Sequence, residues 1–334
     1  MESRLRVTAE STTPLARRDA PHAHRMKLAA FDVGTNTVLM LAVELDRGRA
    51  PRVLADRSRI TRLGRGVDRN GALDPESAAR TLDAIVEFAG EASALGVERI
   101  VGVATAALRD ARDGNEFIAE VRKRADVPLD IISGDAEAEL SYLAVRRGLE
   151  IGAQARLLIA DIGGGSTELI AAQAGRDLAK RSLQIGSVRL TERFVRSDPP
   201  QEPELEAIVR TVDEALERLG WQFTPDRLIG IAGTVTAICA VALGLESYEH
   251  AVVHGRELSR DQVRATLRRF ISMPLNDRKT LPGLHEGRAD VIIAGTIILD
   301  RVMEYFKANG VTVSDQGVRW GLVWRELEGS ATAC

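Results

Sequence analysis

The apolar residues of the first half of the chain form short runs of strand length, interleaved with stretches in which apolar residues recur at helical spacing. The runs predict strands at residues 27–33, 38–45, 51–60, 98–103 and 129–132. The stretches predict helices at residues 77–95, 116–124 and 136–147. The first three strands follow one another through short turns, which predicts an antiparallel meander. The later alternation of strand and helix predicts parallel pairing in an α/β sheet.

The second half restarts the same pattern and predicts an internal repeat. Its expected strands are residues 157–161, 167–173, 181–185, 228–232 and 311–313. Its expected helices are residues 202–219, 235–243, 260–271 and 288–307, with a last helix from about Gly317 that crosses back to the first domain. Because no long linker separates the halves, we expect two α/β domains that face each other across a cleft. The predicted boundaries are residues 27–135 plus helix 318–334 for domain I and residues 136–317 for domain II.

Two loops of the same design lie about 130 residues apart, and each follows an apolar strand that ends in an aspartate. We name them the first loop, FDVGTNT at residues 31–37, and the second loop, DIGGGSTE at residues 161–168. Asp32 and Asp161 at these strand ends are expected to face the cleft, where carboxylate oxygens suit Mg²⁺. The glycines permit positive φ and close approach of a ligand to the backbone, and the hydroxyl residues add donors. Two facing loops predict a clamp for a phosphate chain, although neither loop ends in the Gly-Lys-Ser/Thr of a P-loop.

Composition and charge narrow the classes of protein without adding a site. The chain has 334 residues, 45% of them hydrophobic, and a formal net charge of −3, so its global electrostatics favour neither nucleic acid nor a membrane surface. Two cysteines, Cys239 and Cys334, form no disulfide framework, which fits a reducing cytoplasm. No apolar run is long enough to span a bilayer. Residues 1–26 are polar and are predicted to be a disordered extension, with Met26 as an alternative start.

Further acids could join the two aspartates in the cleft. Glu137 lies in the first turn of the helix after Ser133, but Asp135 and Glu139 are equally compatible with an acid that merely stabilises the helix dipole. The pattern alone does not rank these three. Glu168 begins a strand, which is a poor place for a solvated acid, so a role with metal or water is favoured.

The spacing of His250 and His254 matches one helical turn, yet no Glu follows the first histidine and Gly255 interrupts the helix. A zinc-binding helix is therefore disfavoured.

A set of motifs resembles the exopolyphosphatase/guanosine pentaphosphate phosphohydrolase (Ppx/GppA) family, in the family's order and over about residues 27–330. Besides the two loops, these motifs are ATAALRD at residues 104–110, ISGDAEAEL at 132–140, AGT at 232–234 and SDQGVR at 314–319. The resemblance implies the short form of a member of the actin, sugar kinase and Hsp70-like superfamily, with two ribonuclease-H-like domains around an active cleft. Arg288 and Asp290 resemble a family Arg-Ala-Asp signature and are interpreted as structural caps of the long apolar helix.

The resemblance also implies roles for individual residues. The catalytic base falls on Glu137, the magnesium-associated acids on Asp161 and Glu168, and Asp32 joins them as a metal ligand. Two positions depart from the family motif: Ala136 replaces its first Glu, and Glu139 replaces an Arg, which weakens an expected phosphate contact or domain-interface pair. The expected phosphate-binding residues come from both loops and from later motifs: Gly34, Thr35, Asn36, Thr37, Arg109, Gly163, Gly164, Gly165, Ser166, Thr167, Gly233, Thr234 and Arg319. Arg109 and Arg319 are equally compatible with surface or interdomain ion pairs.

The resulting hypothesis is an exopolyphosphatase, in which Glu137 activates a water that attacks the terminal phosphate of inorganic polyphosphate. The resemblance implies Mg²⁺ as cofactor, with or without a monovalent cation such as K⁺, and a homodimer. The alternative substrate is guanosine pentaphosphate, which would be hydrolysed to the tetraphosphate. Other classes with the same clamp are a sugar kinase-like phosphotransferase and a non-hydrolytic alarmone or nucleotide sensor. The sequence gives no positive sign of a nucleoside pocket or a hydroxyl acceptor, and Glu137 with Glu168 argues against the sensor.

Overall fold

The computed structural model describes residues 25–46, 49–151, 154–173 and 179–332, and for residues 330–332 only the backbone. Its first sheet has the strand order β3-β2-β1-β4-β5. The strands are β1 (Met26–Val33), β2 (Thr37–Leu45), β3 (Arg52–Ile60), β4 (Arg99–Ala104) and β5 (Asp130–Ile131). β2 pairs antiparallel with β1 and β3, whereas β4 pairs parallel with β1 and β5. The predicted meander and the predicted parallel pairing are therefore confirmed.

The second sheet repeats this topology and adds an edge strand, with the order β10-β11-β9-β6-β7-β8. Its strands are β6 (Leu157–Ile162), β7 (Thr167–Ala172), β8 (Ala179–Leu183), β9 (Arg227–Ile231), β10 (Glu257–Ser259) and β11 (Gly310–Val313). β6, β7 and β8 form a meander, and β9 pairs parallel with β6 and β11. The predicted internal repeat is confirmed, and the short strand β10 is an addition that the sequence did not predict. We call the parts built on the first and second sheets domain I and domain II.

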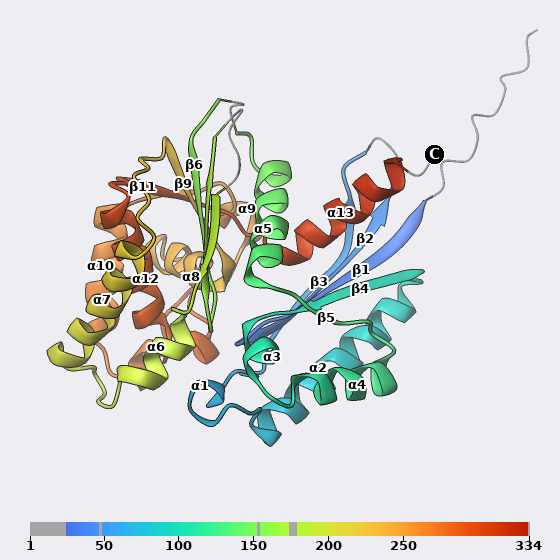
Figure 1. Cartoon of the computed structure of the whole chain (residues 1–334), viewed down its shortest axis with the longest axis horizontal. Helices are drawn as coiled ribbons and strands as arrows, with labels where there is room; N and C mark the ends of the chain where they lie inside the picture. Colours follow the sequence, from blue (N-terminus) through green and yellow to red (C-terminus); the bar gives the residue numbers. More distant parts are fainter. Residues whose placement is uncertain (1–24, 47–48, 152–153, 174–178, 333–334) are drawn as a thin grey trace, which may run out of the picture.

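Helices cover both faces of the first sheet (Figure 1). One face packs on α2 (Pro75–Ala94) and α4 (Gly114–Ala125) through buried Phe31, Ile85 and Val121. The other face packs on the last helix, α13 (Val318–Thr332), through Leu28, Leu41 and Leu322. The last helix thus lies on the first sheet, as predicted, although it follows directly after the last strand of the second.

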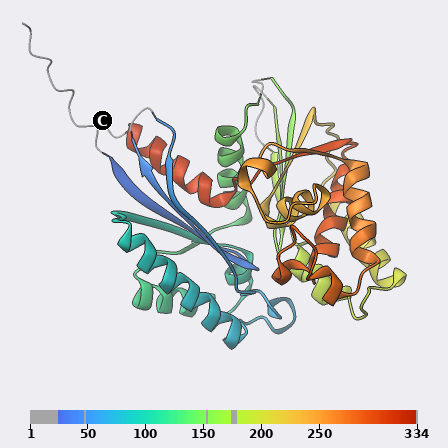
Figure 2. The ribbon, with the colours of Figure 1, turned by 180° about the vertical axis from the view of Figure 1, so that it is seen from behind.

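The second sheet has its larger group of helices on the side away from domain I (Figure 2). The core on that side is buried Leu158, Leu169 and Phe270 with many aliphatic side chains. The helices are α6 (Ser187–Phe194), α7 (Glu202–Glu217), α8 (Ala232–Ala242), α10 (Arg260–Ile271) and α12 (Ile292–Tyr305). Short turns complete the chain: α1 (Val67–Asn70), α3 (Ala106–Asp110), α9 (His250–Val253), α11 (Leu275–Arg278) and the 3-10 turn η1 (Glu286–Arg288).

Helix α5 (Gly134–Gly148) lies between the two sheets (Figure 1). Leu140 and Ala144 are one helical turn apart and join the core under the first sheet and α13. Ala138 and Val145 lie on another side of the helix and pack against the second sheet. A helix buried on two sides is held rigidly, so α5 fixes the position of any side chain in its first turn relative to both domains.

Several sequence predictions fall at the ends of the described ranges. The predicted disordered extension lies outside the described residues except for Arg25 and Met26, and Met26 opens β1. Cys334 also lies outside them, while Cys239 is buried in α8. Within the described ranges, no helix is both long and apolar enough to cross a membrane.

Candidate active site

The two loops occupy the same place in the two sheets and make the same turn. The first loop connects β1 to β2, and the second connects β6 to β7. In the first, the N–H of Gly34 donates to the carbonyl oxygen of Thr37 over 3.0 Å. In the second, the N–H of Gly163 donates to the carbonyl oxygen of Ser166, also over 3.0 Å. The loops face each other, because the side chain of Thr35 lies against Gly164 and Gly165.

The glycines of the second loop serve that close approach rather than an unusual backbone conformation. A Cβ on Gly165 would lie 2.8 Å from Oγ1 of Thr35 and 2.9 Å from Cβ of Ala106. None of Gly163, Gly164 and Gly165 is among the positive-φ glycines, so the expectation of positive φ is wrong here. Side chains of the other domain approach the loop backbone closely, and the expected approach of a ligand stays a prediction.

Acidic side chains gather between the loops. Asp161 is the last residue but one of β6 and is paired in register with Glu168 on β7, and the side chains of both are buried. Ser141 on α5 donates its hydroxyl hydrogen to Oδ2 of Asp161 over 2.7 Å. Ser182 on β8 donates to Oε1 of Glu168 over 2.6 Å. The hydroxyl groups fix the orientation of both carboxylates without neutralising them.

Burial and mutual repulsion raise the pKa values of this cluster. Burial raises the pKa of Asp32 to about 7, the charge of Asp161 acts in the same direction, and the guanidinium of Arg319 opposes it. Burial also raises the pKa of Asp161, against the hydrogen bond from Ser141. The pKa of Glu168 is raised by burial and by Asp161. A cluster of buried carboxylates with raised pKa values indicates a site that favours the binding of a cation.

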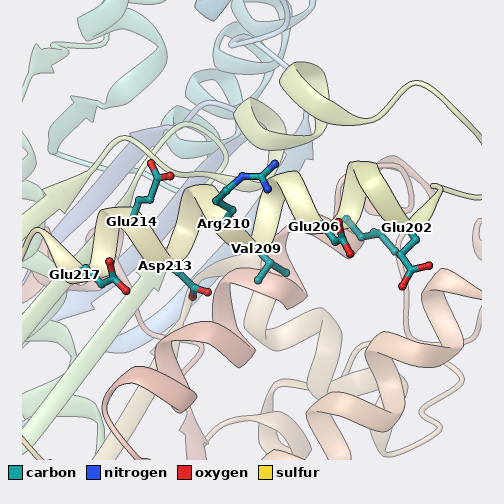
Figure 3. Close-up of a pocket in the computed structure, with 8 residues that line it drawn as sticks. Glu202, Glu206, Val209, Arg210, Asp213, Glu214 and Glu217 are labelled. Atoms are coloured by element: carbon teal, nitrogen blue, oxygen red, sulfur yellow. The ribbon is translucent and has the colours of Figure 1, made fainter.

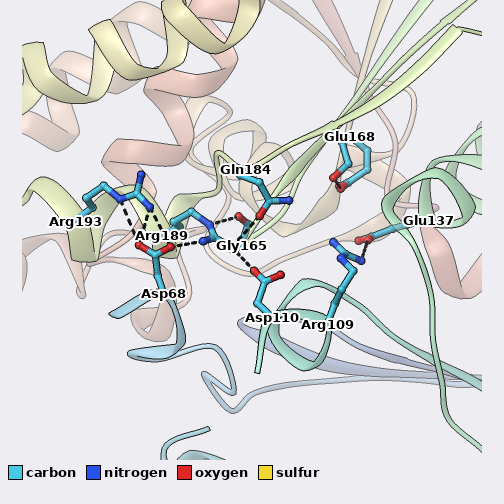
Figure 4. A network of polar contacts seen from close by, with 10 residues as sticks. Asp68, Arg109, Asp110, Glu137, Gly165, Glu168, Gln184, Arg189 and Arg193 are labelled. Carbon is cyan, nitrogen blue, oxygen red and sulfur yellow. Dashed lines mark hydrogen bonds and ion pairs between the residues drawn. The ribbon is translucent and has the colours of Figure 1, made fainter. Parts of the chain in front are cut away.

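Glu137 lies beside this cluster, in the first turn of α5, and only 8% of its surface is exposed. Its pKa lies well above the ordinary range because of burial and the charges of Glu168, Asp161 and Asp32, in that order. Arg109 points toward it, with 3.4 Å between Nη1 of Arg109 and Oε2 of Glu137 (Figure 4). The structure thus distinguishes the three acids that the sequence left open, because Glu137 is buried whereas Asp135 and Glu139 are exposed.

Among the other predicted residues, some polar groups have partners in the protein and others have none. The hydroxyl of Thr167 donates to the carbonyl oxygen of Ile185, and Ser166 hydrogen-bonds to Glu168, so both hydroxyls have partners within domain II. Three donors of the predicted residues are buried without a partner among the described residues: Nδ2 of Asn36, Nη2 of Arg109 and Nε of Arg319. Arg319 donates to Oδ2 of Asp56 over 3.0 Å and lies near Asp32.

Arg288 is the functional candidate that sequence reasoning misjudged. It is not a cap of the apolar helix, because α12 begins at Ile292 and Arg288 belongs to the turn η1. Its guanidinium lies over Gly233, where a Cβ would approach Cζ to 2.2 Å, and Nη2 donates to Oγ1 of Thr37 over 3.3 Å. Burial lowers its pKa to about 10, so it carries a positive charge at neutral pH. The side chain therefore joins the first loop to the AGT motif, whose Thr234 packs against Gly295.

The partner of Arg288 in the signature has a structural role of a different kind. Asp290 accepts hydrogen bonds from Arg62 over 2.7 and 3.0 Å, which ties domain II to the segment after β3. The departure at Glu139 also has a partner, since Lys180 forms an ion pair with it. His250 binds Asp315 through Nδ1 at 2.6 Å, and His254 stacks on His250.

The donor set suits a hard cation, but it is not a closed cage. In the described ranges, no group of three or more His, Cys, Asp and Glu side chains is arranged to hold a metal ion by itself. Asp161 is near enough to Asp32 and to Glu168 to raise the pKa of both, and carboxylate oxygens are the type that Mg²⁺ prefers. This arrangement fits an ion whose remaining ligands are substrate phosphate oxygens and water.

An open groove of about 520 Å³ on the outer face of α7 offers no competing phosphate site (Figure 3). One Arg and five acids line it, together with Leu205 and Val209. These residues are Glu202, Glu206, Arg210, Asp213, Glu214 and Glu217. Five carboxylates would repel a phosphate chain.

The duplicated sheets and the loops that face each other define an actin-like fold with a polar site between its domains. A model of the Ppx/GppA phosphatase family matches residues 42–329, and the chain belongs to that family. Exopolyphosphatase 2 of Mycobacterium tuberculosis is 34% identical over 315 residues, which cover 89% of this chain and 97% of that protein.

Solved structures agree with this assignment. An exopolyphosphatase from Cytophaga hutchinsonii superposes with a TM-score of 0.84 at 25% identity, over 91% of this chain and 98% of that one. A Ppx/GppA family member from Aquifex aeolicus has a TM-score of 0.77 at 29% identity, over 92% and 99%.

Proposed function

We propose that this protein is an exopolyphosphatase, which hydrolyses the terminal phosphate of inorganic polyphosphate and releases orthophosphate. The observation that carries the proposal is the position of Glu137, a buried carboxylate with a raised pKa beside Asp161 and Glu168. A phosphate clamp that only binds does not require a base at this position. Relatives with the name exopolyphosphatase, similar over nine-tenths of the chain, support the same reaction.

In this proposal Glu137 takes a proton from a water molecule as the water oxygen forms a bond to the terminal phosphorus. The bridging P–O bond breaks, and the shortened chain leaves with the electron pair of that bond. A base is most effective when its pKa lies near the working pH, and burial shifts Glu137 in that direction. Arg109 orients the carboxylate through its contact at 3.4 Å.

Donors around the two loops would bind the phosphate oxygens. Nδ2 of Asn36 and Nη2 of Arg109 are buried without partners among the described residues, and an unpaired buried donor costs about 1–3 kcal/mol until a ligand satisfies it. Arg288 adds a positive charge next to Thr37. Charge that develops on the terminal phosphate would thus meet fixed donors from both domains.

Asp161, Glu168 and Asp32 would hold Mg²⁺ together with phosphate oxygens. When bound, Mg²⁺ would neutralise charge on the phosphate oxygens and reduce the electrostatic repulsion that the carboxylates exert. Activity should be lost in excess chelator and restored by Mg²⁺, with the requirement for K⁺ tested in the same assay. Full activity in chelator would remove the metal from the proposal.

The homodimer and the cytoplasmic location remain predictions of the family resemblance. Light scattering on the purified protein tests the homodimer.

A comparison of substrates tests the proposed function. Orthophosphate release is measured side by side from long-chain polyphosphate, guanosine pentaphosphate and ATP, each with Mg²⁺. We expect the highest kcat/KM with polyphosphate. A preference for guanosine pentaphosphate would assign the alternative phosphohydrolase activity. Phosphate transfer from ATP to an added acceptor would indicate a kinase, and tight binding without release would indicate a sensor.

A further inference from the structure

The short helix α6, which the sequence did not predict, holds the backbone of the second loop. The N–H of Ser187 donates to the carbonyl oxygen of Gly163 over 3.0 Å. The N–H groups of Val188 and Arg189 donate to the carbonyl oxygen of Gly164 over 2.9 and 3.1 Å. In a trans peptide the N–H points opposite to the C=O, so the N–H groups of Gly164 and Gly165 face away from α6. The helix therefore sets the direction in which the loop presents its donors.

The carbonyl oxygen of Gly165 is held by a side chain of α6, not by the helix backbone. Nε of Arg189 donates to the carbonyl oxygen of Gly165 over 2.7 Å. By the same geometry, this contact turns the N–H of Ser166 away from α6. The orientation of that peptide thus depends on where the Arg189 guanidinium is held.

Domain I holds the guanidinium. Nη1 of Arg189 pairs with Asp68 on α1, and Nη2 pairs with Asp110 on α3, whereas Gln184 of domain II accepts from Nη2 over 3.1 Å (Figure 4). Only 11% of the Arg189 side chain is exposed, so these pairs are screened less by solvent than surface pairs are. All three nitrogens of the guanidinium donate hydrogen bonds, and two of the partners belong to the opposite domain.

The surroundings are closely packed where the two domains meet. Between them remains a cavity of only about 10 Å³, lined by residues of both domains such as Thr35, Ala107 and Val188. The carboxylate of Glu192, also on α6, accepts the N–H of Gly66 of domain I over 3.0 and 3.1 Å. Asp68 and Asp110 can therefore reach Arg189 only when the domains are together.

We propose that Arg189 is a positioning residue that couples domain closure to the geometry of the second loop. When Asp68 and Asp110 engage its guanidinium, Nε is placed to hold the Gly165 carbonyl, and the loop presents its N–H groups to the terminal phosphate. When the domains separate, the two acids withdraw and the Gly165–Ser166 peptide loses its fixed orientation. This inference rests on the proposed function, because it assigns the loop to phosphate.

Steady-state kinetics of two kinds of variant test this coupling. For Arg189→Met, kcat with polyphosphate should fall at least about tenfold while KM changes less than about threefold, because misplaced donors mainly affect the transition state. The double variant Asp68→Asn with Asp110→Asn leaves Arg189 and Gly165 intact, yet should reproduce most of this loss. Arg189→Lys, which keeps the charge but loses the planar guanidinium with its several N–H donors, should not restore the wild-type kcat. If Arg189→Met does not fold, the aspartate variants carry the test.

Arg193→Met is the matched control, since Arg193 lies on the same helix and pairs with Asp68 over 2.8 Å but contacts no residue of the loop among those described. Its kcat should stay within about twofold of wild type. A normal kcat for the folded Arg189→Met variant would overturn the proposal. So would a normal kcat for the double aspartate variant, because the loop would then not depend on domain I. If the wild-type protein prefers guanosine pentaphosphate, the proposed function fails, but the same variants assayed on that substrate still decide the coupling.

Discussion

The hydroxyl of Ser141 donates a hydrogen bond to Oδ2 of Asp161 over 2.7 Å, and both side chains are buried. Ser141 lies one helical turn after Glu137, so the same face of α5 provides the proposed base and the group that orients a proposed metal ligand. The two functions are thereby fixed in one rigid element. Substitutions of Ser141 and of Glu137 therefore test the two functions separately.

Ser141→Ala should raise the Mg²⁺ concentration for half-maximal activity about tenfold or more, because groups that orient metal ligands typically contribute this much to metal affinity or activity. The hydrogen bond lowers the pKa of Asp161, so its loss should also move the acidic limb of the pH–rate profile toward higher pH. Mg²⁺ titrations of phosphate release measure the first effect. Thr81→Val is the control, since it removes a buried hydroxyl on α2 that donates to the carbonyl oxygen of Ser77. An unchanged Mg²⁺ requirement in Ser141→Ala would separate Asp161 from the metal.

Asp32 should make the folded protein less stable as the pH rises. Its pKa is raised from 3.8 to about 7, so between these values the folded chain retains a proton that the unfolded chain has released. The free energy of unfolding therefore falls as the pH rises through this window. Asp32→Asn cannot ionise, and in the presence of chelator its Tm relative to wild type should be higher at pH 8 than at pH 5. Equal Tm differences at the two pH values would contradict the raised pKa.

Arg288→Lys should weaken substrate binding although it conserves the charge. The planar guanidinium of Arg288 contacts Thr37 and at the same time covers Gly233. A lysine ammonium group cannot make both contacts. A hydrogen bond that involves a charged group contributes about 1.5–3 kcal/mol, so KM should rise about tenfold or more with a smaller change in kcat. Arg269→Lys, on the exposed face of α10, should behave as wild type. An unchanged KM for Arg288→Lys would assign this arginine to the fold alone.

The parts of the fold that local sequence determines could be predicted. The strands, the antiparallel meanders and both turns after Asp32 and Asp161 follow from apolar runs and from glycine next to a carboxylate. Helix α6 was missed, because it has only eight residues and is held by hydrogen bonds to the Gly163 and Gly164 carbonyls and by contacts with domain I. The periodicity of apolar residues reveals neither these hydrogen bonds nor these contacts.

The site was predictable only in part, for a related reason. Spacing placed the acids at strand ends, but it could not choose Glu137 over Glu139, because the choice depends on which side of α5 faces Asp161. Arg288 was interpreted as a cap, since only the folded chain brings it over Gly233, 55 residues earlier in the sequence. The contact of the glycine triplet with Thr35 could not be predicted either, because Thr35 belongs to the other domain.

The most direct test of the account compares Glu137→Gln with Glu139→Gln, two substitutions of the same chemistry two residues apart on α5. Glu139 is exposed and pairs with Lys180, whereas Glu137 is buried beside Asp161 and Glu168. Orthophosphate release from polyphosphate should fall at least about a hundredfold in Glu137→Gln, the usual contribution of a general base, with polyphosphate binding retained. Glu139→Gln should release phosphate at nearly the wild-type rate. Near-normal release by Glu137→Gln would contradict the assignment of Glu137 as the base that activates water.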